Sequence, residues 1–149
     1  MEIEKFMFET DSRYFQDKKY VLCNTCALAR NGLSYEYGAY IDVLTTKKNM
    51  DGLQFHFASF TYEKNIDYEH YVKETLPNRN LLLPTKERAI VEAIIHIDRC
   101  PEGILIEAIK MYLEDNDDLS KLYEVSDFFK LSRDTLEYWL EEARNETEE

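Results

Sequence analysis

Three cysteines and one histidine are the side chains of this sequence that could together do chemistry. Cys23 and Cys26 form a C-x-x-C, and His96 stands four residues before Cys100, so the latter two would share a helix face. Three thiolates and one imidazole make a Cys3His zinc set. No second C-x-x-C accompanies them, however, and core-filling side chains give the same pattern. We expect no metal and no other cofactor, and we expect reduced thiols because the odd number of cysteines has no export signal beside it.

The carboxylate of Asp42 is a second candidate, because it lies on a predicted strand. Nucleotidyl transfer needs two strand carboxylates that hold metal ions against a triphosphate, and the position where the second would fall is Leu44. No serine or cysteine stands beside a histidine in a nucleophile motif, and the four glycines form no phosphate loop. The sequence therefore predicts no catalytic residues and a protein that is not an enzyme, with Asp42 as an exposed strand residue.

Glu87 and Arg88 open a predicted central helix. A glutamate there complements the helix dipole, and Arg88 could pair with a carboxylate elsewhere in the chain as a structural latch. Contact of Arg88 with a partner protein is the functional alternative. His56 alternates with aromatic residues on a predicted strand and is expected to face solvent, whereas His70 lies in a polar stretch.

The negative charge is concentrated towards the C-terminus. The chain has 149 residues, 44% of them hydrophobic, and a net charge of −12. Residues 81–149 hold 18 acidic and eight basic side chains, whereas residues 1–50 hold seven of each. Neutralisation of phosphates by Lys and Arg dominates nucleic-acid binding, so direct nucleic-acid binding is not expected. An acidic face attracts a basic partner, although a face that is merely solvated has the same composition.

Targeting and membrane signals are missing from the sequence. No apolar run approaches the roughly 18 residues that a membrane helix needs. Residues 1–5 lack the basic and then apolar pattern of a signal peptide. We expect a cytoplasmic protein that does not contact a membrane.

Hydrophobic patterning and turn residues predict a small mixed lobe over residues 1–83. A short helix is expected to end at Gly32, and Asp51 and Gly52 are expected to form the turn of a hairpin loop between two strands. The predicted elements are a short apolar run at 20–23, a helix at 25–30, strands at 39–45 and 53–60, a loop at 46–52, a short helix at 67–74 and a strand at 80–83.

Residues 84–144 have the periodicity of about four helices. The expected N-terminal caps are Thr85, Asp118 and Ser132, and Pro101 suits the first turn of the second helix. Residues 145–149 are predicted to be a frayed acidic tail. The fold class predicted is α+β: a small N-terminal lobe of few strands and a short helix, packed on a C-terminal bundle of about four helices.

The order of several short motifs resembles the C-terminal domain of AbiEi-type antitoxins, which belong to type IV toxin–antitoxin systems of bacterial abortive infection. The resemblance runs from about Tyr20 to Ala143, without the N-terminal winged helix that reads DNA in that family. The matching segments are Tyr20-Val21-Leu22, Ala27-Leu28, Gly32-Leu33, the strands at 41–45 and 53–57, and Pro84 with Glu87-Arg88-Ala89, where Thr85 and Lys86 widen the spacing. The resemblance implies neutralisation of a nucleotidyltransferase-type toxin, generally without a stable complex. The missing winged helix puts operon autoregulation in doubt.

These observations predict a non-enzymatic, antitoxin-like protein for phage defence. Its function would be to neutralise or regulate a nucleotidyltransferase-type toxin. Two other classes remain open: an acidic nucleic-acid mimic or phage-type inhibitor that binds a basic protein, and an unrecognised enzyme. The residues expected to contact the partner are Glu124, Asp127, Glu137, Glu141 and Arg88.

Overall fold

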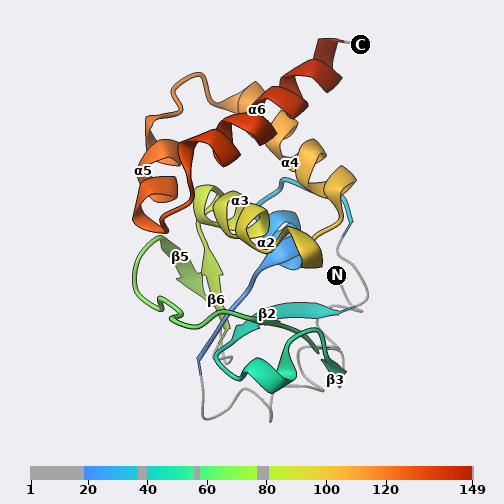
Figure 1. Cartoon of the computed structure of the whole chain (residues 1–149), viewed down its shortest axis with the longest axis vertical. Helices are drawn as coiled ribbons and strands as arrows, with labels where there is room; N and C mark the ends of the chain where they lie inside the picture. The colour runs from blue at the N-terminus through green and yellow to red at the C-terminus, as the bar shows by residue number, and fades with distance from the viewer. Residues whose placement is uncertain (1–18, 37–39, 56–57, 77–80, 149) are drawn as a thin grey trace.

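The structure is a computed structural model that describes residues 19–36, 40–55, 58–76 and 81–148. It is a mixed α+β fold in which N-terminal strands form small sheets and a helical region follows (Figure 1). This confirms the predicted fold class. The strands are β1 (Tyr20–Val21), β2 (Ile41–Thr45), β3 (Gln54–Phe55), β4 (Ala58–Tyr62), β5 (Val72–Thr75) and β6 (Leu81–Pro84). The helices are α2 (Asn24–Arg30), η2 (Lys48–Met50), α3 (Lys86–Ile95), η3 (Ile97–Arg99), α4 (Glu102–Asp115), α5 (Ser120–Phe128) and α6 (Arg133–Glu148).

The described strands form two three-stranded sheets. The first has the order β1-β6-β5, with β1 parallel and β5 antiparallel to β6. The second has the order β2-β4-β3, with β2 parallel and β3 antiparallel to β4. A single antiparallel bridge, between Leu22 and Val43, joins these described strands across the two sheets. At this bridge β1 of the first sheet meets β2 of the second.

The predicted hairpin around residues 46–52 is wrong. The strand that pairs with β2 is β4, and the two run parallel, because η2 and β3 lie between them in the chain. The predicted strand at 53–60 is divided into β3 and β4, which pair with each other. Gly52 has a positive φ of +79°, and Asp51 Oδ1 accepts a hydrogen bond from Tyr62 N at 2.9 Å. This turn directs the chain into β3, which is antiparallel to β4. The segment that contains η2 and β3 thus forms the connection that two parallel strands, β2 and β4, require.

The predicted helix at 67–74 is also wrong. Asp67 Oδ1 accepts hydrogen bonds from Glu69 N at 2.8 Å and from His70 N at 2.7 Å, which forms a tight local turn. Tyr71 then has a positive φ of +57°. The following residues form β5, which pairs with β6. Side-chain hydrogen bonds to the backbone compete with helix formation here, and the strand partner comes from a distant part of the chain.

The described C-terminal helices agree with the predicted bundle. Thr85 Oγ1 accepts from Arg88 N at 3.3 Å, and Ser132 Oγ accepts from Thr135 N at 3.1 Å, so both residues cap their helices as expected. Asp118 Oδ1 accepts from Ser120 N at 2.9 Å at the start of α5. Helix α6 continues through Glu148, so the predicted frayed tail at 145–149 is wrong over residues 145–148.

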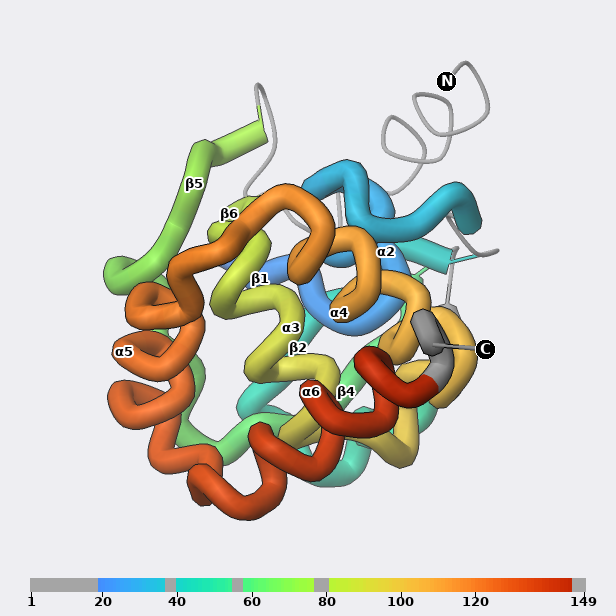
Figure 2. Tube along the Cα trace, turned by 90° about the horizontal axis from the view of Figure 1, so that it is seen from above, coloured from blue at the N-terminus to red at the C-terminus, as the bar shows by residue number. Residues whose placement is uncertain are grey.

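One continuous apolar core joins the two predicted lobes. It contains Leu22, Ala27 and Leu28 from the N-terminal part together with Ile90, Leu105 and Leu140 from the helices. Figure 1 shows the helices at one end of the molecule and the sheets at the other, with α2 and α3 between them. Seen from above, α4, α5 and α6 lie around α3 (Figure 2). Among the described residues, no helix has the length and apolar character needed to cross a membrane.

Candidate functional site

The residues of the possible zinc set do not converge. Cys26 and Cys100 lie in the main core, whereas Cys23 lies in a second small cluster that includes Val21. His96 is bound elsewhere, with Nε2 at 2.9 Å from Oε1 of Glu63. Among the residues that the structure describes, no three His, Cys, Asp or Glu side chains are placed to hold a metal ion.

All three cysteines are buried thiols. Burial raises the pKa of Cys23 well above its usual value, and burial raises the pKa of Cys100 to about 12. The negative charge of Asp42 acts in the same direction on both pKa values. Protonated, buried thiols are poor nucleophiles and poor metal ligands, so their arrangement indicates a packing role.

Asp42 is not the exposed strand residue that the sequence predicted. It is half-buried on β2, and its Oδ2 accepts a hydrogen bond from Cys26 N, at the start of α2, at 3.2 Å. Burial raises the pKa of Asp42 to about 6, and the hydrogen bond from Cys26 opposes that rise. Asp42 therefore caps α2 from a neighbouring strand and fixes the helix against the second sheet. Helix α2 begins at Asn24, whose φ is +51°.

Arg88 lies inside the molecule and not on a surface that a partner could reach. Its side chain is fully buried, with Nε donating to Glu92 Oε1 at 3.1 Å. Nη1 donates to the carbonyl oxygen of His70 at 2.8 Å, and Nη2 to that of Asp67 at 2.6 Å. The guanidinium also lies over the ring of Phe129, 4.9 Å from its centroid. The structure thus removes Arg88 from the expected partner-binding set, because its side chain is buried, pairs with Glu92 on the same helix and latches α3 to the segment before β5 through two backbone carbonyls.

Glu92 and Glu63 continue this buried polar centre. Burial raises the pKa of Glu92 above its usual value, the Arg88 charge opposes that rise, and the nearby Glu63 adds to it. Oε2 of Glu63 is buried without a hydrogen-bond partner among the described residues, while its Oε1 contacts His96. Arg88 and Glu92 are buried, and Glu63 and His96 are nearly so. This polar cluster therefore contributes to the stability of the fold and is not open to a substrate.

Three further residues weighed from the sequence are His70, His56 and Glu87. His70 is exposed, with Nδ1 at 2.9 Å from Asp67 Oδ2 and its ring 4.8 Å from that of Phe128. His56 lies outside the described residues. Glu87 is buried and accepts a hydrogen bond from the Tyr112 hydroxyl at 2.9 Å, so it serves the core.

The remaining predicted contact residues all lie on the surface of α5 and α6. Asp127 and Glu137 lie at the α5–α6 junction: Asp127 Oδ2 accepts from Arg133 at 3.2 Å, and Glu137 accepts from the hydroxyl of Tyr123. Glu141 lies one turn further along α6, with Oε2 3.8 Å from Arg144 Nη1. Glu124 accepts from the Tyr71 hydroxyl at 3.1 Å and so lies on the β5 side of α5. Three of the four carboxylates thus gather near one edge of the bundle.

A hollow of about 440 Å³ lies beside this edge, between the end of α4 and α6. Its polar rim includes the exposed carboxylates of Glu114 and Asp117, and its apolar part comes from the half-buried Leu113 and Leu119. We call it the α4–α6 hollow; its lining is Lys110, Leu113, Glu114, Asn116, Asp117, Leu119 and Arg144. The sequence placed a polar break here but gave no sign that α6 would return to enclose it.

A second cavity, which the sequence did not indicate, opens between the two sheets. None of the groups with a raised carboxyl or thiol pKa lines it, because Asp42, Glu92, Cys23 and Cys100 lie in the packed interior. A catalytic centre typically combines a cavity with such perturbed groups. In the described part of the chain these carboxyl and thiol groups do not line the cavity, whereas Tyr68, whose pKa burial also raises, does.

Comparison with protein-family models gave no match for this chain, and a search of curated proteins gave none either.

Proposed function

We propose that this protein is an antitoxin-like, non-enzymatic regulator that neutralises a nucleotidyltransferase-type toxin through the acidic surface of α5 and α6. The toxin class comes from the resemblance of the sequence to AbiEi-type antitoxins. The choice of surface follows from the acidic charge of the sequence, and the observation that supports it is the exposure of Asp127, Glu137 and Glu141 along one edge of the bundle.

The existing contacts of these carboxylates leave them available to a partner. The Asp127 and Arg133 side chains are 60% and 55% exposed, and those of Glu141 and Arg144 are 64% and 43% exposed. Exposed ion pairs contribute only about 0–1 kcal/mol. A basic partner can therefore exchange its own Lys or Arg for these intramolecular contacts at little cost. Enzymes that act on nucleotides or RNA need basic phosphate-binding surfaces, which supplies the complementary charge.

The α4–α6 hollow supports the same surface. A Lys or Arg side chain has an apolar stem and a cationic head. The stem can pack on Leu113 and Leu119 while the head meets the carboxylates of Glu114 or Asp117. Electrostatic complementarity of this kind raises the rate of encounter more than the final affinity. A short-lived complex is thus sufficient for the proposed function.

Charge reversal tests the proposal in cells that also express a nucleotidyltransferase-type toxin. The test variant changes Glu124, Asp127, Glu137 and Glu141 to Lys. The matched control changes four exposed carboxylates elsewhere, Glu36, Glu74, Asp98 and Glu107, to Lys, and so shifts the net charge by the same amount. Exposed substitutions typically change stability by within about 0.5 kcal/mol each, which circular dichroism and thermal unfolding would check.

The expected result is that the control still restores growth and the test variant does not. If both folded variants restore growth, the α5–α6 surface does not carry the function. If both fail, total negative charge matters and the position of the carboxylates does not, which also contradicts a defined surface.

A further inference from the structure

The cavity between the two sheets has a simple structural origin. β1 and β2 meet at the antiparallel Leu22–Val43 bridge, so two residues further out Tyr20 and Thr45 face each other across the gap. There each strand pairs with a different neighbour: Tyr20 is in register with Leu81 of β6, and Thr45 with Tyr62 of β4. The sheets part at this point and leave a space of about 430 Å³, within the usual range for small-molecule sites.

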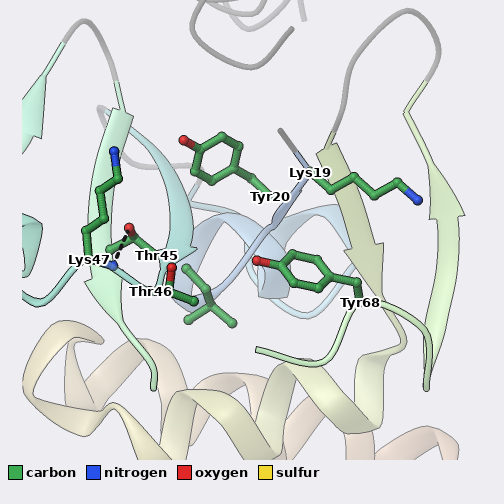
Figure 3. A pocket seen from close by; sticks show the side chains of 7 residues that line it. Lys19, Tyr20, Thr45, Thr46, Lys47 and Tyr68 are labelled. Carbon is green, nitrogen blue, oxygen red and sulfur yellow. Dashed lines mark hydrogen bonds between the residues drawn. The ribbon is translucent and has the colours of Figure 1, made fainter. Parts of the chain in front are cut away.

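The lining of this space is rich in hydrogen-bond donors. We call it the inter-sheet pocket, and its lining residues are Lys19, Tyr20, Leu44, Thr45, Thr46, Lys47 and Tyr68. Figure 3 shows the hydroxyls of Thr46 and Tyr68 facing each other, with Lys47 rising beside Thr45 and Tyr20 above. Thr45 Oγ1 accepts from Lys47 N at 3.1 Å, which holds the turn that carries Lys47. Burial raises the pKa of Tyr68, with further contributions from Tyr20 and Glu63, so its hydroxyl remains a donor.

The charge of the lining is opposite to that of the protein. The whole chain has 30 acidic and 18 basic side chains, yet the lining contains two lysines and no carboxylate. Within the described part of the chain neither lysine forms an ion pair. Lys47 stands at the pocket, whereas the side chain of Lys19 extends away from it (Figure 3). An uncompensated ammonium beside several hydroxyl donors favours an anion with several acceptor oxygens.

The rest of the lining favours a flat ring on that anion. Tyr20 and Tyr68 contribute aromatic rings to the lining, and Leu44 contributes an apolar side chain. Tyr20 is itself held against Phe60, with ring centroids 6.4 Å apart in an edge-to-face arrangement. Rings prefer offset or edge-to-face contacts with such a surface.

We propose that the inter-sheet pocket binds a small phosphate monoester that carries a flat ring, a molecule of about the size of a nucleoside monophosphate. Its phosphate oxygens accept hydrogen bonds from Lys47, Thr46 and Tyr68, and its ring lies between the two tyrosines. The three terminal oxygens of a phosphate monoester use these donors more fully than the two oxygens of a carboxylate. This site goes beyond the proposed antitoxin-like function and does not depend on it.

Isothermal titration calorimetry of the purified full chain tests the site directly. The probes are phenyl phosphate, UMP and AMP, each compared with its ring lacking the phosphate (phenol, uridine and adenosine) and with inorganic phosphate alone. We expect saturable binding of at least one monoester with Kd below about 1 mM, and binding at least about tenfold weaker for its uncharged counterpart and for inorganic phosphate. No binding of any monoester in that range overturns the proposal, as does equal binding of the bare ring or of inorganic phosphate.

Two substitutions with matched controls locate the binding. Lys47→Ala should weaken it by about tenfold or more, because it removes a charge-assisted contact. Lys48→Ala, on the adjacent exposed lysine that does not line the pocket, should leave it unchanged. Tyr68→Phe should weaken binding severalfold, whereas Tyr35→Phe, on an 85% exposed tyrosine, should not. Equal effects of the paired variants would place the binding elsewhere and contradict the assignment.

Discussion

The guanidinium Nε of Arg88 lies 3.1 Å from Oε1 of Glu92, in an ion pair whose side chains are 0% and 1% exposed. The remaining donors of Arg88 bind the carbonyl oxygens of Asp67 and His70. Arg88 therefore joins the central helix to the segment before β5, across the boundary between the two predicted lobes, while Glu92 on the same helix balances its charge. A buried charge is costly unless it is fully paired. Removal of either Arg88 or Glu92 would therefore leave the other charge buried without its partner.

Arg88→Met is expected to lower the free energy of unfolding by about 3–5 kcal/mol, because it leaves the Glu92 carboxylate buried without its cation. Urea unfolding followed by circular dichroism measures this change. The control is the double variant Arg88→Met/Glu92→Met, which removes both charges and should be less destabilised than Arg88→Met. A loss below about 1 kcal/mol in the single variant, or a double variant that is the less stable of the two, would contradict a buried latch.

Asp42→Asn is expected to change how stability depends on pH. The pKa of Asp42 is raised to about 6 in the folded protein, so the folded state holds this proton more tightly than the unfolded state. The resulting stability is fully present below about pH 4 and is lost as the pH rises through about 6. The Asn variant lacks this loss and can still accept from Cys26 N. The free energy of unfolding of Asp42→Asn minus that of the wild type should therefore be about 1–3 kcal/mol more favourable at pH 7 than at pH 4.

Unfolding at several pH values between 4 and 7.5 checks that expectation. Asp98→Asn is the matched control, because it neutralises an exposed aspartate in η3. The free energy of unfolding of Asp98→Asn should differ from that of the wild type by a constant amount over the same pH range. A constant difference between Asp42→Asn and the wild type from pH 4 to pH 7 would show that burial of Asp42 does not govern its protonation.

Tyr112→Phe tests the second buried contact of α3. The Tyr112 hydroxyl donates to Glu87 Oε2 at 2.9 Å, and its loss leaves a buried carboxylate oxygen without that donor. A cost of about 1–3 kcal/mol in unfolding free energy is expected. Tyr138→Phe, on a tyrosine that is 54% exposed, should cost less than about 0.5 kcal/mol. Equal costs for the two variants would indicate that the Glu87 contact adds nothing.

The helical half of the fold was predictable because its signals are local. Thr85 and Ser132 are capping residues next to apolar periodicity, and both cap as expected. The strands were harder to predict, because their pairing joins distant segments. Nothing near residues 67–74 indicates that β5 will find β6, and the bridge between Leu22 and Val43 has no signature in either neighbourhood.

The two proposed binding surfaces differ in the same way in how far the sequence could predict them. The exposed carboxylates of α5 and α6 follow from charge and helical spacing, so they could be named from the sequence. Burial of Arg88 could not be predicted from the sequence, because its partners include two backbone carbonyls that only the folded chain brings together. The inter-sheet pocket depends on Tyr20, Thr45 and Tyr68 meeting where the sheets part, and no spacing in the sequence relates these three residues.

Growth of cells that express a nucleotidyltransferase-type toxin, with and without this chain, tests the proposed function most directly. A catalytically inactive toxin serves as the control for expression burden. The antitoxin-like function predicts that the wild-type chain restores growth to the level seen with the inactive toxin. Continued arrest in cells that contain the folded wild-type chain at a level above that of the toxin would contradict it.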